Sequence, residues 1–143
     1  MPLIRLTVSS GSLTEEGHAE IRQELAGAAL SWEGFPDTAF FRGLSWVYLT
    51  ELPEGVQGTA GDDAPRFLVE VTVPQATSPV PDKSGLIHDI TQVVLKAAGL
   101  DRHAASRVWV LVHEQPEGSW GAGGAVVRHA DLTALADAQR AAS

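Results

Sequence analysis

Apolar and β-branched residues gather in four short runs that predict β-strands. Two of them, Leu3–Val8 and Phe67–Val73, are bounded by proline or by serine and glycine. Two others begin near Trp46 and Val108 and are rich in valine, leucine and aromatic residues. Each run has the length of a strand, and none approaches the length of a membrane-spanning helix.

Between the strands of each pair, apolar residues recur at helical spacing. The first helix is expected to start at Ser12-Leu13-Thr14-Glu15, which has the form of a capping box, and to end near Gly34. The second is expected to start within Pro81–Ser84 and to stop at Gly99. The apolar stripes are Ile21, Leu25, Ala28 and Trp32 in the first helix and Leu86, Ile90, Val93, Val94 and Ala97 in the second.

The chain carries an internal repeat. Residues 46–61 align without a gap to residues 109–124, with eight identities in sixteen positions, where about one is expected by chance. The same offset of 63 carries Pro2 onto Pro65. This self-similarity predicts a module that occurs twice and whose two copies begin at equivalent points.

We interpret the chain as a single domain of two strand–helix–strand repeats, 2–61 and 65–127, followed by a tail, 128–143. A helix between two strands of one sheet implies a right-handed crossover and parallel pairing within each repeat. The predicted fold class is α+β, a duplicated βαβ fold with a four-stranded, mainly parallel or mixed sheet and both helices on one face. We further expect an edge strand at 125–128 and a helix over 131–142, capped by its first residue, an aspartate.

The predicted fourth strand has two different faces, because side chains alternate along a strand. Arg107, Trp109, Leu111 and His113 share one face, and the other face is mostly valine and suits the helices. Nothing within the repeats covers Trp109 and Leu111. We therefore expect a second subunit to cover them, which makes the protein an oligomer.

The composition is that of a folded globular domain, with 44% hydrophobic and 20% charged residues. A net charge of −8 and only ten scattered basic residues argue against nucleic acid as a partner. The absence of cysteine excludes disulfides, thiolate metal ligands and cysteine nucleophiles. Residues 1–8 lack the features of a secretory signal, so we expect a cytoplasmic protein that does not bind membranes.

The histidines do not predict a metal site. His113-Glu114 begins like a zinc-binding HExxH helix, but Glu117 stands where the second histidine is needed, and Pro116 prevents the helix. The five histidines show no ligand spacing. We therefore expect neither a metal nor a cofactor, and we retain His113 only as a candidate second acid or base because it shares a strand face with Trp109.

Three features together resemble the tautomerase superfamily: the proline after the initiator methionine, the duplicated βαβ unit, and the ending Val108–Gly124 with its Trp-Gly-Ala-Gly-Gly stretch. The family includes 4-oxalocrotonate tautomerase (4-OT), which has one short βαβ unit per chain. In size this chain is similar to doubled members such as malonate semialdehyde decarboxylase and cis-3-chloroacrylic acid dehalogenase. The resemblance implies that Met1 is removed, that the nitrogen of Pro2 then serves as general base or acid, and that Trp120 forms an aromatic wall near it. It also implies a homotrimer.

The chemistry of proline is compatible with this role. Only a proline at a chain terminus has a nitrogen that can take a proton, because every internal proline nitrogen, including that of Pro65, is an amide. The pKa of a free α-amino group is near 8 in water, and burial lowers it by disfavouring the charged form. Such an amine at Pro2 is neutral near pH 7 and can act as a base.

The arginines with which family members hold a substrate carboxylate have no counterpart in the corresponding loops. Those loops, 9–12 and 74–83, contain no arginine. Arg107 and Lys83 are the best remaining cations for an anionic substrate, and each is equally compatible with an ordinary surface residue. The predicted substrate-binding residues are therefore Arg107, Lys83, Trp109 and Trp120.

These observations lead to one preferred function and two alternatives. The preferred function is a cofactor-independent keto–enol tautomerase, an isomerase that acts through Pro2 on a small carbonyl or enol acid. The alternatives are a non-catalytic oligomeric binding protein that kept the fold, and a hydratase or decarboxylase of the same superfamily. The first-helix histidine of the dehalogenases corresponds to Ala29 here, which argues against water activation.

Overall fold

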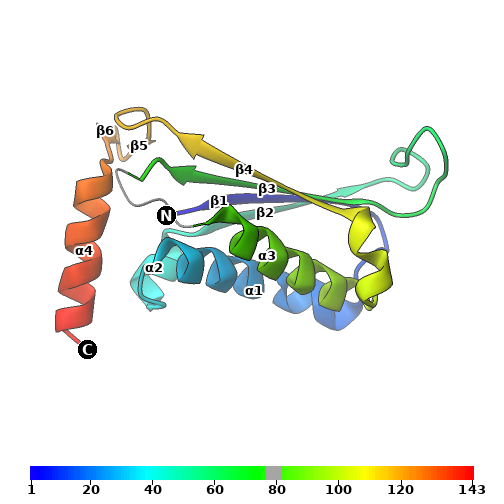
Figure 1. The fold of residues 1–143 in the computed structure, drawn as a ribbon, viewed down its shortest axis with the longest axis horizontal. Coiled ribbons are helices and arrows are strands. Elements are labelled where there is room, and N and C mark those ends of the chain that lie inside the picture. The colour runs from blue at the N-terminus through cyan, green and yellow to red at the C-terminus, as the bar shows by residue number, and fades with distance from the viewer. Residues whose placement is uncertain (77–81) are drawn as a thin grey trace.

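The core of the molecule is a four-stranded sheet with two long helices on one face (Figure 1). The computed structural model describes residues 1–76 and 82–143. The strands are β1 (Leu3–Ser9), β2 (Trp46–Leu52), β3 (Phe67–Pro74) and β4 (Val108–Gln115). Their order is β2-β1-β3-β4, with parallel pairing within each repeat and antiparallel pairing between β1 and β3. The predicted α+β fold with a mixed sheet is confirmed.

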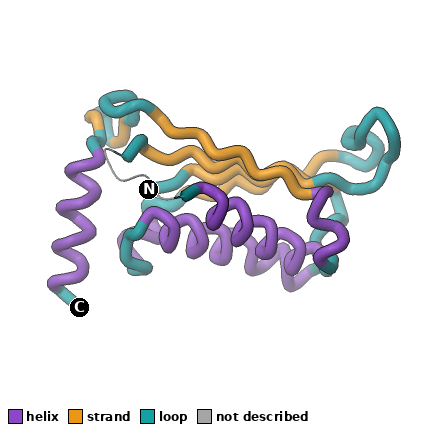
Figure 2. The backbone as a smooth tube through the Cα atoms, in the orientation of Figure 1, coloured by secondary structure: helices purple, strands orange, loops and turns teal. Residues whose placement is uncertain are grey.

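The long helices, α1 (Glu15–Glu33) and α3 (Lys83–Ala98), lie side by side across the same face of the sheet (Figure 2). The residue that caps α1 is Thr14, whose hydroxyl accepts a hydrogen bond from the Gly17 N–H at 2.9 Å. The cap therefore lies two residues after Ser12, and the expected capping box does not form, because the third helical residue is Gly17. Each helix ends at a glycine in the left-handed conformation, as the sequence predicts.

The start of α3 is set by Asp82. Its carboxylate accepts a hydrogen bond from the Ser84 N–H at 2.9 Å, and the first helical residue is Lys83. Pro81, which the sequence includes in this start, lies outside the described residues, as does part of the loop 74–83. None of the helices in the described part of the chain is long and apolar enough to span a bilayer.

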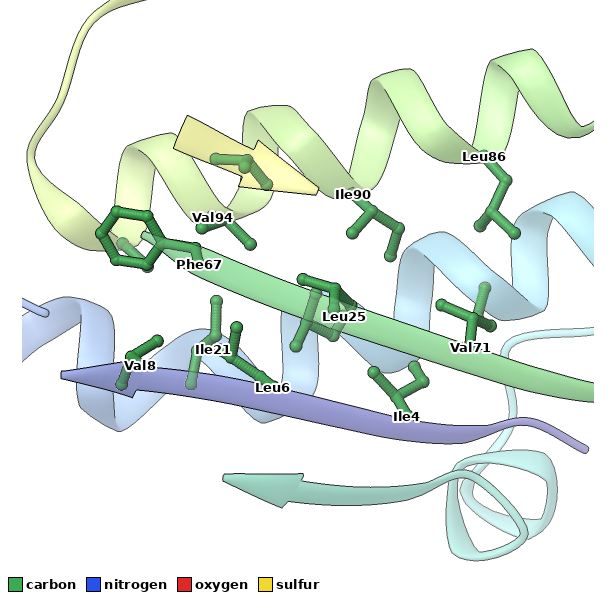
Figure 3. Close-up of a cluster of buried hydrophobic side chains, with 14 of the residues drawn as sticks. Ile4, Leu6, Val8, Ile21, Leu25, Phe67, Val71, Leu86, Ile90 and Val94 are labelled. Carbon is green, nitrogen blue, oxygen red and sulfur yellow. The ribbon is translucent and has the colours of Figure 1, made fainter. Parts of the chain in front are cut away.

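The hydrophobic core lies between the sheet and the two helices (Figure 3). The alternation along β1 turns three of its residues to the core, and alternate residues of β3 face the core in the same way. Full burial of one such aliphatic side chain contributes about 1.5–3 kcal/mol to stability. The core includes Ile4, Leu6, Val8, Ile21, Leu25, Val69, Val71, Leu86, Ile90 and Val94.

The two helices are packed tightly against each other at Gly17. A Cβ atom at this position would lie 2.0 Å from the carbonyl oxygen of Ala97, so a larger residue would push the helices apart. The same carbonyl accepts a hydrogen bond from the Thr14 N–H at 2.9 Å. The first turn of α1 is thus attached to the last turn of α3, and the helices run antiparallel.

Strand pairing corrects the predicted alignment of the repeats. Leu3 pairs with Trp46 in the first repeat, whereas Leu68 pairs with Trp109 in the second. The second strands therefore correspond at the offset of 63, but the first strands correspond at 65. Because of this shift, the residue in the structural position of Pro2 is Phe67, not Pro65, and the segment between helix and second strand is two residues shorter in the second repeat.

A short helix precedes the second strand of each repeat, and neither was predicted. They are α2 (Ala39–Gly43) and the 3₁₀ helix η1 (Arg102–Arg107). Arg107 thus ends η1 and does not open the fourth strand. In Figure 1 the amino terminus and α2 lie at one end of the sheet, and η1, drawn in yellow, lies at the other end beside the 53–66 loop.

The last part of the chain forms a hairpin and a helix beside the amino terminus (Figure 1). The hairpin consists of β5 (Gly121–Ala122) and β6 (Ala125–Val126), which pair only with each other. The run 125–128 therefore does not extend the main sheet as an edge strand. The helix is α4 (His129–Ala141), and Asp131 lies in its first turn, where it accepts a hydrogen bond from the Arg128 N–H at 3.0 Å.

Candidate active site

Pro2 is buried at the start of β1, a central strand of the sheet. Its carbonyl oxygen accepts a hydrogen bond from the Trp46 N–H at 3.0 Å. This bond extends the parallel pairing of β1 and β2 by one residue beyond β1. This hydrogen bond to the sheet fixes the position of the first residues of the chain.

The amino terminus opens onto a cavity of about 450 Å³. Its walls are largely apolar, and they come from β1, the start of β2, and the β5–β6 hairpin. The turn of this hairpin is formed by Gly123 and Gly124, which have φ values of 62° and 82° that most other residues avoid. The residues that line the cavity are Met1, Pro2, Leu3, Leu44, Trp46, Trp120, Gly121, Ala122 and Gly123.

The amino group of the chain is held by Glu33, the last residue of α1. The Met1 ammonium lies 3.1 Å from Oε1 and 3.0 Å from Oε2 of this carboxylate. The two side chains are only 9% and 8% exposed, respectively. Burial lowers the pKa of the amine below its usual value, and the carboxylate partly opposes that change. Burial likewise raises the pKa of Glu33, against the effect of the amine.

Glu33 was not among the residues predicted from the sequence. The signal that could have indicated it is topological. In a strand–helix–strand unit the helix runs back along the first strand, so its last turn lies above the first residues of that strand. A carboxylate immediately before the helix-ending Gly34 is thus expected near residue 2.

Trp120 is the predicted site residue that lies with Pro2 in this cavity. Lys83 is at the same end of the molecule, because the Trp32 indole N–H donates to the neighbouring Asp82 carbonyl at 3.0 Å. Its ammonium group, however, pairs with Glu114 at 3.6 Å and does not line the cavity.

His113 lies on the open face of the sheet. Its Nε2 is 4.0 Å from the Glu70 carboxylate, and its backbone pairs with Thr72, which in turn pairs with Leu3. Two strand spacings of about 4.8 Å therefore separate His113 from β1. It is a neighbour of the cavity rather than part of its wall.

Arg107 and Trp109 lie away from Pro2 within the chain. They line a separate cavity at the opposite end of the sheet. The structure thus divides the predicted substrate-binding residues between two ends: Trp120 and Lys83 at the amino-terminal end, and Arg107 and Trp109 at the other.

The face of the sheet opposite the helices exposes large apolar side chains, as the sequence predicts. Trp109 is 70% exposed, Trp46 61%, Tyr48 50% and Leu111 42%. These residues lie on the two outer strands, β2 and β4. Within residues 1–76 and 82–143, no three histidine, aspartate or glutamate side chains come close enough together to hold a metal ion.

Comparison with known proteins supports one family. The sequence model of a family described as "Tautomerase enzyme" matches residues 68–130. No curated protein matches the chain.

Solved structures share the fold over nearly the whole chain. A fused 4-OT solved as an asymmetric trimer is 18% identical, with a TM-score of 0.71 over 93% of this chain and 98% of that one. A protein solved after inactivation by 2-oxo-3-pentynoate is 21% identical, with a TM-score of 0.71 over 87% of this chain and 95% of that one. A member of the cis-3-chloroacrylic acid dehalogenase family is 21% identical, with a TM-score of 0.69 over 87% and 82%.

Proposed function

We propose that this chain, which belongs to the tautomerase superfamily in its doubled form, is a cofactor-independent keto–enol tautomerase whose base is the amine of Pro2 after removal of Met1. The observation that carries this proposal is the position of the amino terminus. It is buried, fixed by the sheet, and open to an apolar cavity of about 450 Å³. This volume suits a small organic acid.

The proposed reaction moves one proton. The lone pair of the neutral Pro2 amine takes a proton from the carbon next to a carbonyl group, and the electron pair of the broken C–H bond passes to the carbonyl oxygen to form an enolate. The resulting ammonium then returns the proton to a different atom of the substrate. An apolar wall supports this role, because burial lowers the pKa of an amine and keeps it neutral near pH 7.

Glu33 is the group that we assign to the tuning of this amine. In the chain with Met1, its carboxylate bonds the terminal ammonium. After loss of Met1, we expect the amine of Pro2 to take the place of the Met1 amine beside this buried carboxylate. Glu33 then stabilises the ammonium formed during the reaction and limits how far burial lowers its pKa. We regard Glu33 as a positioning residue.

Two of the predicted substrate-binding residues suit this end of the molecule. Trp120 supplies the aromatic wall of the cavity. Lys83 is the nearest of the predicted cations, and a substrate carboxylate would compete with Glu114 for its ammonium group. His113 remains a candidate for a second acid or base, because it lies on the sheet face that borders this end.

We further propose that the protein is a cytoplasmic homotrimer. The open face of the sheet carries Trp46, Tyr48, Trp109 and Leu111, and burial of such a surface favours association. The fused 4-OT with the same fold was solved as a trimer. Light scattering is expected to give the mass of three chains of 15.1 kDa, and a monomer mass would contradict the proposal.

The function is tested on purified protein by two linked measurements. The mass of the amino-terminal peptide is expected to lack Met1, and the absorbance of an enol of an α-keto acid is expected to decay faster with the protein than without it. An acetylenic keto acid such as 2-oxo-3-pentynoate is expected to attach to Pro2 and to stop turnover. Turnover by protein that retains Met1 would refute the role of Pro2. Absence of turnover in the Met1-free protein would favour a non-catalytic binding protein.

A further inference from the structure

A second cavity, of about 240 Å³, lies at the end of the sheet opposite Pro2. It is enclosed by the start of β3, the end of η1, the start of β4 and the 53–66 loop. Figure 1 shows this loop and η1 together at one end of the sheet, away from the amino terminus. The residues that line it include Arg66, Phe67, Leu68, Arg107 and Trp109.

This second cavity is the repeat-related copy of the Pro2 cavity. With the register of the strand pairs, Leu68 corresponds to Leu3 and Trp109 to Trp46. Gly58 of the loop corresponds to Gly121 of the hairpin, at the offset of 63. Each cavity is lined by the leucine and the tryptophan of one repeat and by the glycine of the other repeat. The two cavities are therefore built in the same way.

The two cavities differ at several positions, and at the offset of 63, Gln57 stands in the place of Trp120. Phe67 replaces Pro2, and its ring is 2% exposed. Arg66 replaces Met1, and Arg107 replaces Leu44. The second cavity therefore has lost the terminal amine and has gained two guanidinium groups. A site built on this frame can bind an anion but has no counterpart of the Pro2 base.

Arg107 is more available to bind a ligand than Arg66, because Arg66 already pairs with a carboxylate of the protein. Arg66 pairs with the Asp62 carboxylate at 3.1 Å and donates to the Ala64 carbonyl at 2.8 Å. The pKa of Asp62 is lowered chiefly by the Ala64 N–H and then by Arg66, with a smaller effect of the Arg107 charge. Among the described residues, no carboxylate lies within 4.0 Å of the Arg107 guanidinium. Asp63, next to Gly58, adds a further negative charge nearby.

We propose that the second cavity binds a small organic carboxylate with an apolar body, whose carboxylate is held by Arg107 and whose apolar part lies against Leu68 and Trp109. Guanidinium groups bind carboxylates through two parallel hydrogen bonds, which favours a carboxylate ligand. Asp62 occupies Arg66 in the free protein and competes with the ligand for it. The site does not depend on Pro2 or on turnover.

The proposal is tested with benzoate as the probe, on the Pro2→Ala variant, in which the secondary amine at the other cavity is replaced. Binding is followed through the indole N–H signals in ¹H–¹⁵N spectra, with the Trp109 signal assigned by Trp109→Phe. We expect benzoate to shift the Trp109 signal in a saturable way. Shifts confined to the signals of Trp46 and Trp120 would overturn the proposal.

Two charge variants and one control identify the binding group. Arg107→Met is expected to weaken benzoate binding at least tenfold, and Asp62→Asn is expected to tighten it several-fold by releasing Arg66. Arg102→Met is the control, because Arg102 is exposed on the same short helix and does not line the cavity. Equal affinity of wild type and Arg107→Met would overturn the assignment, and so would weaker binding in Asp62→Asn.

The chemical class of the ligand is tested with inorganic phosphate and acetate. Acetate has the charge of benzoate without its ring, and phosphate is an anion of equal or greater charge without an apolar body. We expect benzoate to bind at least tenfold more tightly than either ion. Equal affinities for benzoate and phosphate would overturn the claim that the site selects an organic carboxylate.

Discussion

The two cavities at opposite ends of the sheet are built on the same strand–helix–strand frame, but only one of them holds an ionisable backbone nitrogen. The first strand of one repeat begins at the terminus of the chain, whereas that of the other continues from a linker. An internal peptide nitrogen cannot take a proton. Duplication within one chain therefore copies the walls of the cavity but not the terminal amine that we propose as the base.

The comparison also shows which parts of the frame are shared. Trp46 and Trp109 occupy equivalent positions, as do Gly121 and Gly58. The differences include the residues at the start of the first strand and the residue two positions before the tryptophan, Leu44 or Arg107. The proton transfer that we propose at one end and the anion binding that we propose at the other therefore differ by a few residues.

The largest effect is expected for loss of the terminal base. Pro2→Ala replaces a secondary amine held in a fixed ring by a flexible primary amine, and we expect kcat/KM for an enol acid to fall about 10²–10⁴-fold, the usual contribution of a general base. Pro65→Ala is the matched control, since Pro65 is exposed and lines neither cavity. A similar loss in both variants, measured by enol absorbance, would remove the distinction between the two ends.

The next largest effect is expected for trimer formation when Trp109 is replaced. Trp109→Glu places a charge on the open face of the sheet and is expected to cost at least about 2 kcal/mol of association energy, as at other aromatic interface positions. Light scattering at micromolar concentration should then show monomers. His103→Glu serves as the control, because its side chain is 80% exposed and projects from η1 rather than from the sheet. A trimer that survives Trp109→Glu would show that this face is not the interface.

A smaller effect is expected for Glu33 on the pH dependence of activity at the amino-terminal end. The Glu33 carboxylate raises the pKa of the buried terminal amine, so Glu33→Gln should lower that pKa further. The amine then stays neutral to a lower pH. The acidic limb of the plot of kcat/KM against pH should therefore shift to lower pH. Glu54→Gln, an exposed substitution at the far end, should leave the limb in place. An acidic limb that stays at the same pH in Glu33→Gln, or shifts to higher pH, would contradict the role of Glu33.

The smallest effect is expected at Lys83. Its ion pair with Glu114 is partly exposed, and pairs of this kind contribute about 0–1 kcal/mol. Lys83→Met should therefore change the melting temperature very little, while a lost contact with a substrate carboxylate should raise KM several-fold without a change in kcat. Lys96→Met, which breaks the pair with Glu24 at 2.8 Å on the helix surface, should change neither. An unchanged KM in Lys83→Met would show that Lys83 does not contact the substrate carboxylate.

Much of this architecture could be predicted from the sequence because local patterns encode it. The periodicity of apolar residues indicates all four strands and both long helices, and glycines mark the helix ends. The exposed tryptophan face of β4 follows from simple alternation. The capping residue of α1 was predicted two positions early because Ser12 and Thr14 are both competent caps, and only the contact of Thr14 with Ala97 decides between them.

The parts of the site that were missed depend on contacts between distant segments. The aligned tryptophans and glycines fix the offset of 63 for the second strands, but they carry no information about the first strands, whose register is set by packing of the core. The position of Arg107 at the far end follows from the antiparallel pairing of β1 with β3 and the parallel pairing of β3 with β4, which put the start of β4 at the end of the sheet opposite the start of β1. Glu33 is brought to the terminus by the antiparallel course of α1 over β1, and it leaves no motif in the sequence.

The central claim is that the buried amine of Pro2 is a neutral base, and the rate at which 2-oxo-3-pentynoate labels the protein at different pH values tests it most directly. The account predicts one adduct per chain, located on Pro2 by peptide mass, with a labelling rate that reaches its plateau at a lower pH than for a free α-amino group, whose pKa is near 8. An adduct on another residue, or a rate that follows the pKa of an amine in solution, would contradict it.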